Sequence, residues 1–159
     1  MQRRDFIVLG CANASVFPVL AHHGWSSFDQ DKPLYLEGKA ESVAWRNPHA
    51  EVKLRITAGL QLPADLPTRA VPAQSASVDA ARVLGAARLP SRKDAVWELE
   101  LAPLTRMQAW NVVEIKPGQA IAVVGYTLSG EKGEAVVRVE YLFVAGKAYG
   151  LRSSPVRGT

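Results

Sequence analysis

Apolar and polar residues alternate along several stretches of this chain, and this two-residue period predicts β-strands. Successive side chains of a strand point to opposite faces of a sheet, so an alternating stretch buries one face only. We expect strands over residues 34–45, 51–56, 96–101, 120–126, 135–144 and 148–151. The stretch 120–126 is continuously apolar and is also predicted to be a strand.

A short helix and several turns complete the pattern. Leu104, Met107 and Trp110 recur three apart, which predicts a helix over 103–111, between the third and fourth strands. Gly38 lies inside the first strand and predicts a bend or a bulge there. Asn47-Pro48 predicts a turn, as do several later glycine and proline pairs.

This order of elements predicts a mainly β fold, a small five- to six-stranded antiparallel Greek-key barrel of the OB-like type. A closed barrel removes the sheet edges that would otherwise pair with other chains. The helix before the fourth strand and the glycine-bent first strand are both features of a five-stranded OB barrel. The alternative is a small open sandwich of the same strands.

A long Ala/Pro-rich insertion interrupts the barrel between the second and third strands. Residues 58–94 contain four prolines, nine alanines and no aromatic residue. We expect this composition to bury little apolar surface, so the segment is predicted to be a flexible loop. One short helix is expected inside it, capped by Ser77 or Asp79 and running through Val83, Leu84 and Ala87.

The first 21 residues have the pattern of an export signal. Arg3 and Arg4 precede the apolar stretch 6–20, and Ala21 ends a small-residue cleavage site. The paired arginines resemble a twin-arginine signal, which directs export of a folded protein. We therefore expect a periplasmic protein, cleaved after Ala21, whose residues 22–159 form one barrel domain. The only cysteine, Cys11, falls within the signal, and no later segment is apolar and long enough to span a membrane.

The net charge excludes one class of partner. The 159 residues carry a net charge of +4, of which residues 1–21 contribute +1 and residues 58–94 contribute +2. The barrel itself is therefore nearly neutral. Since nucleic-acid binding depends on clustered positive charge, we expect no nucleic-acid partner.

Several motifs together resemble a known family. The chain contains Ala21-His22-His23-Gly24-Trp25, then Trp45-Arg46-Asn47-Pro48-His49, then Trp97-Glu98-Leu99 and Pro117-Gly118. This pattern resembles a family of small exported bacterial proteins of unknown function. The resemblance implies the fold and export, and it brings no activity, cofactor or catalytic residue with it.

All three histidines lie in these motifs, and they suggest a metal site. His22, His23 and His49 supply imidazole, the commonest transition-metal ligand, and nitrogen-rich sites favour copper. Cleavage after Ala21 would add the free amine of His22 to this set. A second possibility places Met107 and Trp25 or Trp45 beside Cu(I).

Chain geometry works against a site shared by all three histidines. A straight strand over 34–45 is about 36 Å long. His49 follows its far end, while His23 precedes its near end by a tether that spans at most about 36–40 Å. The tether must therefore double back nearly extended, unless the strand curls strongly. The alternative is that His22 and His23 are merely residues beside a cleavage site and that His49 only stabilises the Asn-Pro turn.

The remaining polar residues suggest binding rather than catalysis. Glu51, Glu98 and Glu100 are expected to be the solvated half of alternating strands, and no nucleophile, base or phosphate-binding loop is present in a recognisable pattern. We expect no enzyme. Either the chain is a copper-binding module, or it is an accessory subunit that contacts a periplasmic protein partner. In both cases the loop residues are Trp45, Arg46 and Asn47, with Trp25.

Overall fold

The alternating stretches form six strands close to their predicted bounds. The computed structural model describes residues 24–156. Its strands are β1 (Leu34–Ala44), β2 (Glu51–Ile56), β3 (Val96–Glu100), β4 (Ala120–Tyr126), β5 (Val136–Val144) and β6 (Lys147–Gly150). Its α-helices are α1 (Ala80–Gly85) and α2 (Leu104–Ala109), and its 3-10 helices are η1 (Trp25–Ser27), η2 (Leu66–Thr68) and η3 (Ser129–Glu131). Neither α-helix of this described part has the length and apolar character needed to cross a membrane.

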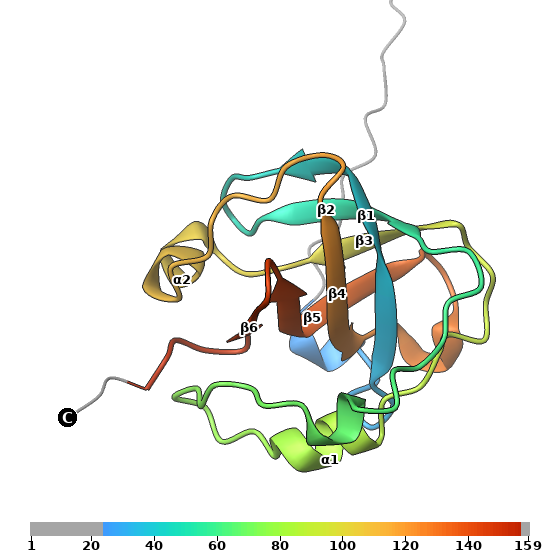
Figure 1. Cartoon of the computed structure of the whole chain (residues 1–159), viewed down its shortest axis with the longest axis horizontal. Coiled ribbons are helices and arrows are strands. Elements are labelled where there is room, and N and C mark those ends of the chain that lie inside the picture. The colour runs from blue at the N-terminus through green and yellow to red at the C-terminus, as the bar shows by residue number, and fades with distance from the viewer. Residues whose placement is uncertain (1–23, 157–159) are drawn as a thin grey trace, which may run out of the picture.

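The strands close into a barrel, which confirms the predicted fold class. The sheet order is β3-β2-β1-β4-β5-β6, and β3 also pairs with β5, so that β1 to β5 form a ring and β6 extends it (Figure 1). The closing pair, β3 with β5, is parallel, and the other pairs are antiparallel. The prediction of a wholly antiparallel barrel is corrected in this respect. An odd number of strands cannot alternate in direction around a closed ring, so one pair must be parallel.

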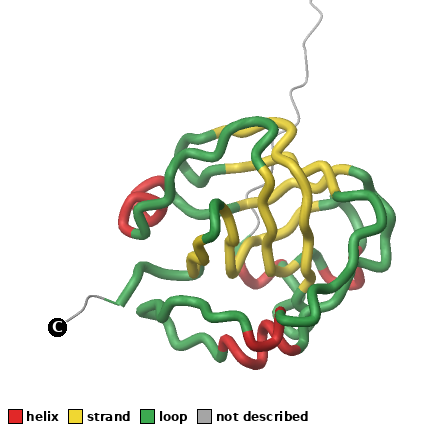
Figure 2. Tube along the Cα trace, in the orientation of Figure 1, coloured by secondary structure: helices red, strands yellow, loops and turns green. Residues whose placement is uncertain are grey.

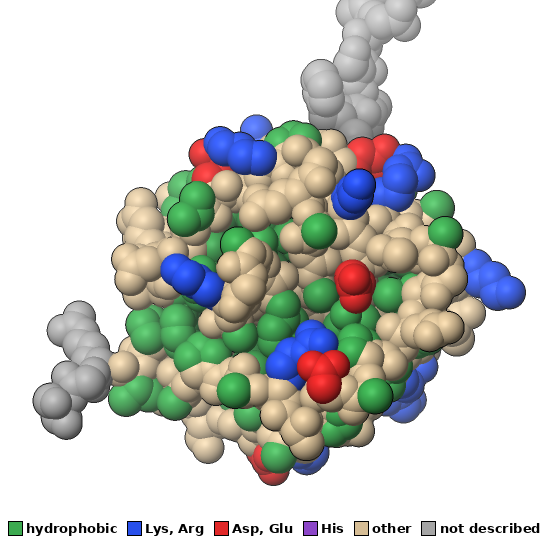
Figure 3. Space-filling view, in the orientation of Figure 1, with side chains coloured by type: hydrophobic (Ala, Val, Ile, Leu, Met, Phe, Trp, Pro, Cys, Tyr) green, Lys and Arg blue, Asp and Glu red, His purple; other side chains and the backbone are tan. Residues whose placement is uncertain are grey.

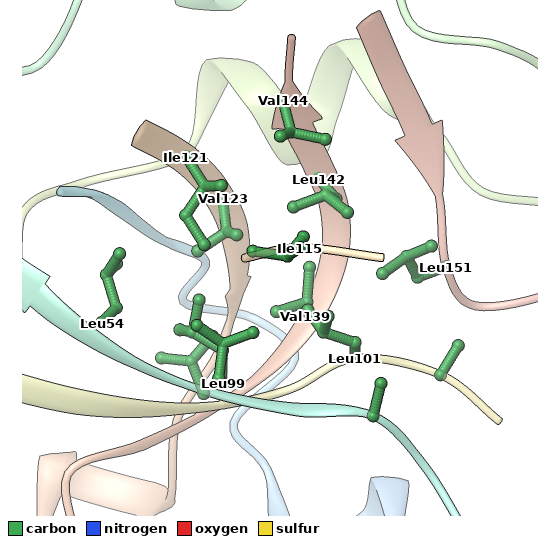
Figure 4. Close-up of a cluster of buried hydrophobic side chains, with 14 of the residues drawn as sticks. Leu54, Leu99, Leu101, Ile115, Ile121, Val123, Val139, Leu142, Val144 and Leu151 are labelled. Carbon is green, nitrogen blue, oxygen red and sulfur yellow. The ribbon is translucent and has the colours of Figure 1, made fainter. Parts of the chain in front are cut away.

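The barrel interior is filled by the inward half of each alternating strand. Val52 and Leu54 of β2 face Trp97 and Leu99 of β3, and all four are fully buried. Figure 4 shows aliphatic side chains from β4, β5 and the connecting segments converging on the same interior, among them Ile115, Val123, Val139 and Leu142. Met107 of α2 is also buried in this core, as the three-residue spacing predicted.

The insertion packs along one side of the barrel (Figures 1 and 2). Helix α1 begins after Asp79, whose carboxylate accepts a hydrogen bond of 2.9 Å from the backbone N–H of Arg82. The predicted helix and cap are thereby confirmed.

The expectation that the insertion buries little apolar surface is wrong. Leu66, Val83 and Leu84 are buried in a second cluster, against side chains of β1, β4 and β5, namely Tyr35, Val124 and Tyr141. These strands carry apolar residues on their outer face as well, and this face needs a cover to be shielded from water. The flexibility of the insertion stays a prediction.

Gly38 permits a close approach of β1 to β2. It pairs with Ile56, and a Cβ at this position would overlap the backbone carbonyl of Arg55. The β1–β2 register shifts between Ala40 and Ser42, two residues further on. The predicted irregularity of the first strand is confirmed, and it lets β1 curl around the barrel.

We expect Gly38→Ala to lower the free energy of unfolding by about 1–3 kcal/mol, because the added methyl forces β1 and β2 apart. Urea denaturation followed by tryptophan fluorescence measures this change. Gly85→Ala is the matched control, since its Cβ would meet open space in α1. It should leave stability unchanged or raise it by up to about 1 kcal/mol. Equal losses of unfolding free energy in Gly38→Ala and Gly85→Ala would show that the close approach of β1 to β2 at Gly38 is not the cause.

Candidate functional site

His49 lies on the outer face of the barrel, at the start of β2. It follows the Asn47-Pro48 turn, whose peptide bond is cis. His49 and Glu51 are two residues apart, so they project from the same face of the chain, while Ala50 between them is buried in the core. Only 5% of the His49 surface is exposed. The histidine is therefore held inside the protein surface and does not extend from it.

Two carboxylates flank the His49 imidazole. Its Nδ1 lies 3.8 Å from Oε1 of Glu51, and its Nε2 lies 3.6 Å from Oε2 of Glu100. The register explains this meeting, because Glu51 of β2 pairs directly with Glu100 of β3. Both ring nitrogens thus face acidic groups.

The parallel closure of the barrel adds a cation to the group. Glu100 pairs with Arg138 of β5, and Nη1 of Arg138 donates a hydrogen bond of 2.9 Å to Oε2 of Glu100. Glu100 is 4% exposed, so its charge is compensated within the protein by Arg138. We call His49, Glu51, Glu100 and Arg138 the His49 cluster.

A further carboxylate extends the acidic surface beside the His49 cluster. Glu98 lies two residues before Glu100 on the same face of β3, opposite Lys53 of β2. Burial raises the pKa of Glu98, and the nearby carboxylates of Glu51 and Glu100 raise it further. Lys53 acts in the opposite direction and only partly offsets these causes.

Trp25 brings the N-terminal part of the chain to this side of the barrel. The guanidinium of Arg138 lies 5.2 Å from the centre of the Trp25 ring, and that of Arg152 lies 4.2 Å from it. Tyr126 meets the same ring edge-on at 6.2 Å. Trp25 therefore packs against Arg138, which is the cation of the His49 cluster.

This placement brings Trp25 close to the residues that surround His49. The estimate of about 36 Å holds only for a straight strand, and the register of β1 shifts between Ala40 and Ser42. Three successive contacts, Trp25 with Arg138, Arg138 with Glu100, and Glu100 with His49, connect the two regions.

Arg152 is fixed by a second buried carboxylate. Glu140 is fully buried, and its Oε2 accepts a hydrogen bond of 2.7 Å from Nε of Arg152. Its Oε1 accepts another, of 2.9 Å, from Nε2 of Gln74 in the insertion. These bonds hold Arg152 in position over Trp25.

The predicted site residues have different outcomes. His49 has the acidic surroundings described above, whereas His22 and His23 lie outside the described residues. Met107 is 1% exposed within the core, against which Trp45 also packs, and a place for Met107 beside Cu(I) stays a prediction. Trp45 packs partly against the core, and Arg46 is exposed.

Asn47 has a structural role in the loop. Its side-chain oxygen accepts a hydrogen bond of 3.2 Å from the backbone N–H of Leu104, the first residue of α2. The loop is thereby tied to α2, and Trp25 belongs instead to the arginine pair described above.

Glu100 was expected to be solvated and is buried instead, and the charged residues Arg138, Glu140 and Arg152 were not predicted as part of a site. A usable pattern was present, because Arg138 and Glu140 are the only charged residues in the otherwise uncharged stretch 135–144. Charged residues in such a strand are buried only when they are paired. This pattern predicts partners, but it does not say which residues they are.

The described residues alone do not form a metal site. Between residues 24 and 156 no group of three or more histidine, cysteine, aspartate or glutamate side chains is arranged to hold a metal ion. The 3.6 Å between His49 Nε2 and Glu100 Oε2 nevertheless matches the separation of about 3.4 Å between two ligands of one tetrahedral ion.

We expect Arg138→Met to lower the free energy of unfolding by about 3 kcal/mol, because it leaves the buried Glu100 carboxylate without its cation. Adding Glu100→Gln should recover part of this loss, since the uncompensated charge is then gone. Chemical denaturation of the two single variants and the double variant measures the coupling. Additive losses would show that the pair is not coupled.

The raised pKa of Glu98 predicts a pH dependence. A carboxyl whose pKa is higher in the folded state binds its proton more tightly there, so stability falls as pH rises above about 4.5 through the folded pKa. Glu98→Gln should therefore be more stable than the wild type at pH 7, by less than about 1 kcal/mol. The difference between them should shrink as pH falls through this window. Thermal unfolding between pH 4 and pH 8 tests this, and a wild type that is more stable than Glu98→Gln at pH 7 would contradict it.

Comparisons with known proteins give a partial family match. No curated protein matches this chain, and no solved structure matches it. A model of a family of unknown function (DUF6152) matches residues 11–61, which is less than half of the chain. The matched stretch includes Trp25, β1, β2 and all three histidines. Over residues 11–61, the chain is therefore similar to a family of unknown function.

Proposed function

We propose that this protein is an exported periplasmic binding module whose ligand is copper, held by His49 together with His22 and His23. The single observation that carries the proposal is the packing of Trp25 on Arg138, within the same chain of contacts as His49. His23 precedes Trp25 by two residues, a reach of about 7 Å. The short separation of His23 and Trp25 in the chain therefore favours a site that His23 shares with His49.

The surroundings of His49 suit a metal ligand. Metal-bound histidines usually direct their second ring nitrogen to a carboxylate, which orients the ring and raises its basicity. Glu51 lies on the Nδ1 side of His49, and the ion would be bound on the Nε2 side. Glu100, on the Nε2 side, is a second ligand of suitable separation, and imidazole and amine nitrogens from the N-terminus would complete a set that favours copper.

The proposed compartment rests on the sequence. Arg3 and Arg4, the apolar stretch after them and Ala21 support export and cleavage that make His22 the first residue. A free α-amine at His22 exists only after this cleavage. Processing would then create one of the ligands.

The alternative is an accessory subunit that binds a periplasmic protein and no metal. The exposure of Arg46, Asn47 and Pro48 at the β1–β2 turn favours a contact surface there. This surface and the His49 cluster are adjacent in sequence but differ in exposure. Experiments on His49 and on Arg46 therefore separate the two functions.

We expect the protein that begins at His22 to bind one Cu²⁺, measured by isothermal titration calorimetry. His49→Ala should weaken binding at least tenfold, because a first ligand is lost, and Trp25→Leu should weaken it because the N-terminal segment loses its anchor. Arg46→Ala is the control and should leave copper binding unchanged.

Circular dichroism establishes that each variant is folded, and His49→Gln replaces His49→Ala if the latter is not. Copper uptake that is unaffected at His49 would confine the site to the N-terminus and overturn the shared site. If the protein takes up no copper, and if it recovers a protein partner that the Arg46→Ala variant fails to bind, the accessory subunit is favoured instead.

A further inference from the structure

A cleft opens where the insertion stops covering the outer face of the barrel. It has a volume of about 410 Å³, within the usual range for small-molecule sites. Its walls come from β1, β4, the β5–β6 hairpin and the segment that follows η2. The face drawn in Figure 3 shows hydrophobic side chains between the barrel and the insertion, with acidic and basic side chains among them.

The floor of the cleft is a row of side chains that the insertion leaves partly open. Tyr35, Val124 and Tyr141 form the neighbouring row across β1, β4 and β5, and the insertion buries them. The floor lies two residues away along each of these strands, on the same face, and continues into β6 as Glu37, Ala122, Phe143 and Ala148. Its three apolar members are only partly buried. Neighbouring strands are about 4.8 Å apart, so the row is about 14 Å long.

The basic side chain over this floor is already neutralised within the insertion. The Arg69 guanidinium lies 5.1 Å from the centre of the Phe143 ring. Nε and Nη2 of Arg69 donate hydrogen bonds of 3.0 and 3.1 Å to the Asp65 carboxylate. Arg69 therefore gives the cleft a wall, but no free positive charge that would attract an anionic ligand.

The end of the floor at the β5–β6 hairpin is apolar. Ala148 lies there, beside the two-residue turn of Ala145 and Gly146. Lys147 also borders the cleft, but it pairs with Val144, so its side chain leaves β6 on the face opposite to Ala148. The floor therefore carries no charge at this end.

The end of the floor at β1 carries a carboxylate. Glu37 is exposed and forms no salt bridge with any residue between 24 and 156. Its Oε2 accepts a hydrogen bond from the Tyr35 hydroxyl, and burial and this carboxylate raise the pKa of Tyr35, so the hydroxyl remains a donor. Lys39, two residues along on the same face of β1, lies outside the lining. The floor thus has one uncompensated charge, which is negative and lies at one end.

We propose that this cleft binds a small aliphatic monoamine. Its ammonium group pairs with Glu37, and its hydrocarbon chain lies over Phe143 and the two alanines of the floor. A carboxylate or phosphate ligand is repelled by Glu37 and finds Arg69 already paired with Asp65. A diamine places its second ammonium at the apolar end, where the floor offers no anion. One cationic end and one apolar end are therefore the chemistry that the charge and the apolar surface of this floor complement.

The experiment compares hexylamine with hexanol and hexanoate, which carry the same chain. Titration of each into ¹⁵N-labelled full-length protein at pH 7, followed by NMR, should shift the amides of Ala122, Phe143 and Ala148. Hexylamine should bind about threefold more tightly than hexanol, since it gains one exposed ion pair, and hexanoate should bind most weakly. Each methylene added between butylamine and hexylamine should raise the affinity about twofold, because the chain is only partly buried.

Variants at the two ends of the floor separate the charge from the apolar surface. Glu37→Gln should abolish the preference for hexylamine over hexanol and leave the affinity for hexanol unchanged. Glu41→Gln is the matched control, because it makes the same change on the same strand at an exposed carboxylate that pairs with Arg55 outside the cleft. It should keep the preference. Ala148→Leu should fill the apolar end and weaken both ligands at least threefold, and Ala148→Val replaces it if it does not fold.

Several outcomes would overturn the proposal. They are the absence of shifts in the floor residues, equal binding of hexylamine and hexanol, and a preference for hexylamine that survives Glu37→Gln. Tighter binding of 1,6-diaminohexane than of hexylamine would also overturn it, because the far end would then hold an anion. Equal binding of hexylamine and Nα-acetyl-lysine methylamide would assign the cleft to a lysine side chain of a protein instead. No sample contains copper, so the result is independent of the function proposed for the His49 cluster.

Discussion

The parallel pairing of β3 with β5 is the constraint on which the rest of this structure depends. A ring of five strands must contain one parallel pair, and here that pair places Arg138 beside Glu100. The pairing closes the last open edge of the barrel and supplies the cation that compensates a buried carboxylate. The guanidinium of Arg138 also packs against the ring of Trp25. One closure thus joins the N-terminal segment, the acidic face and His49 into a single region.

The outer face of the barrel is used in two different ways. Around β2 and β3 it carries charged residues, whose burial is tolerated because Glu100 is paired with Arg138 and lies beside His49. Around β4 and β5 it is apolar, and the insertion covers it with Leu66, Val83 and Leu84. The cover does not reach the β5–β6 hairpin, where small alanines leave a cleft. The charged face around His49 and this cleft therefore occupy separate parts of one barrel surface.

Much of the fold could be predicted from the sequence, because periodicity reports local burial. The bounds of β2 and β4 and the Asp79 cap depend on residues close together in the chain. The burial of the insertion was predicted wrongly because it depends on residues that are far away in the chain. Its alanines, leucines and prolines look too sparse to form a core of their own, and they do not form one. They complete a second core whose other half, Tyr35, Val124 and Tyr141, belongs to distant strands.

By itself, the sequence determined the strands, the short helices and the barrel class, since each follows from neighbouring residues and their spacing. Only the tertiary structure decided that Glu51 and Glu100 flank this histidine, that Arg138 pairs with Glu100, and that Trp25 lies close by. The physical reason is that these contacts join residues from four separate segments. Strand register and barrel closure set their distances, and alternation along one strand shows which side chains point outward but not what they meet.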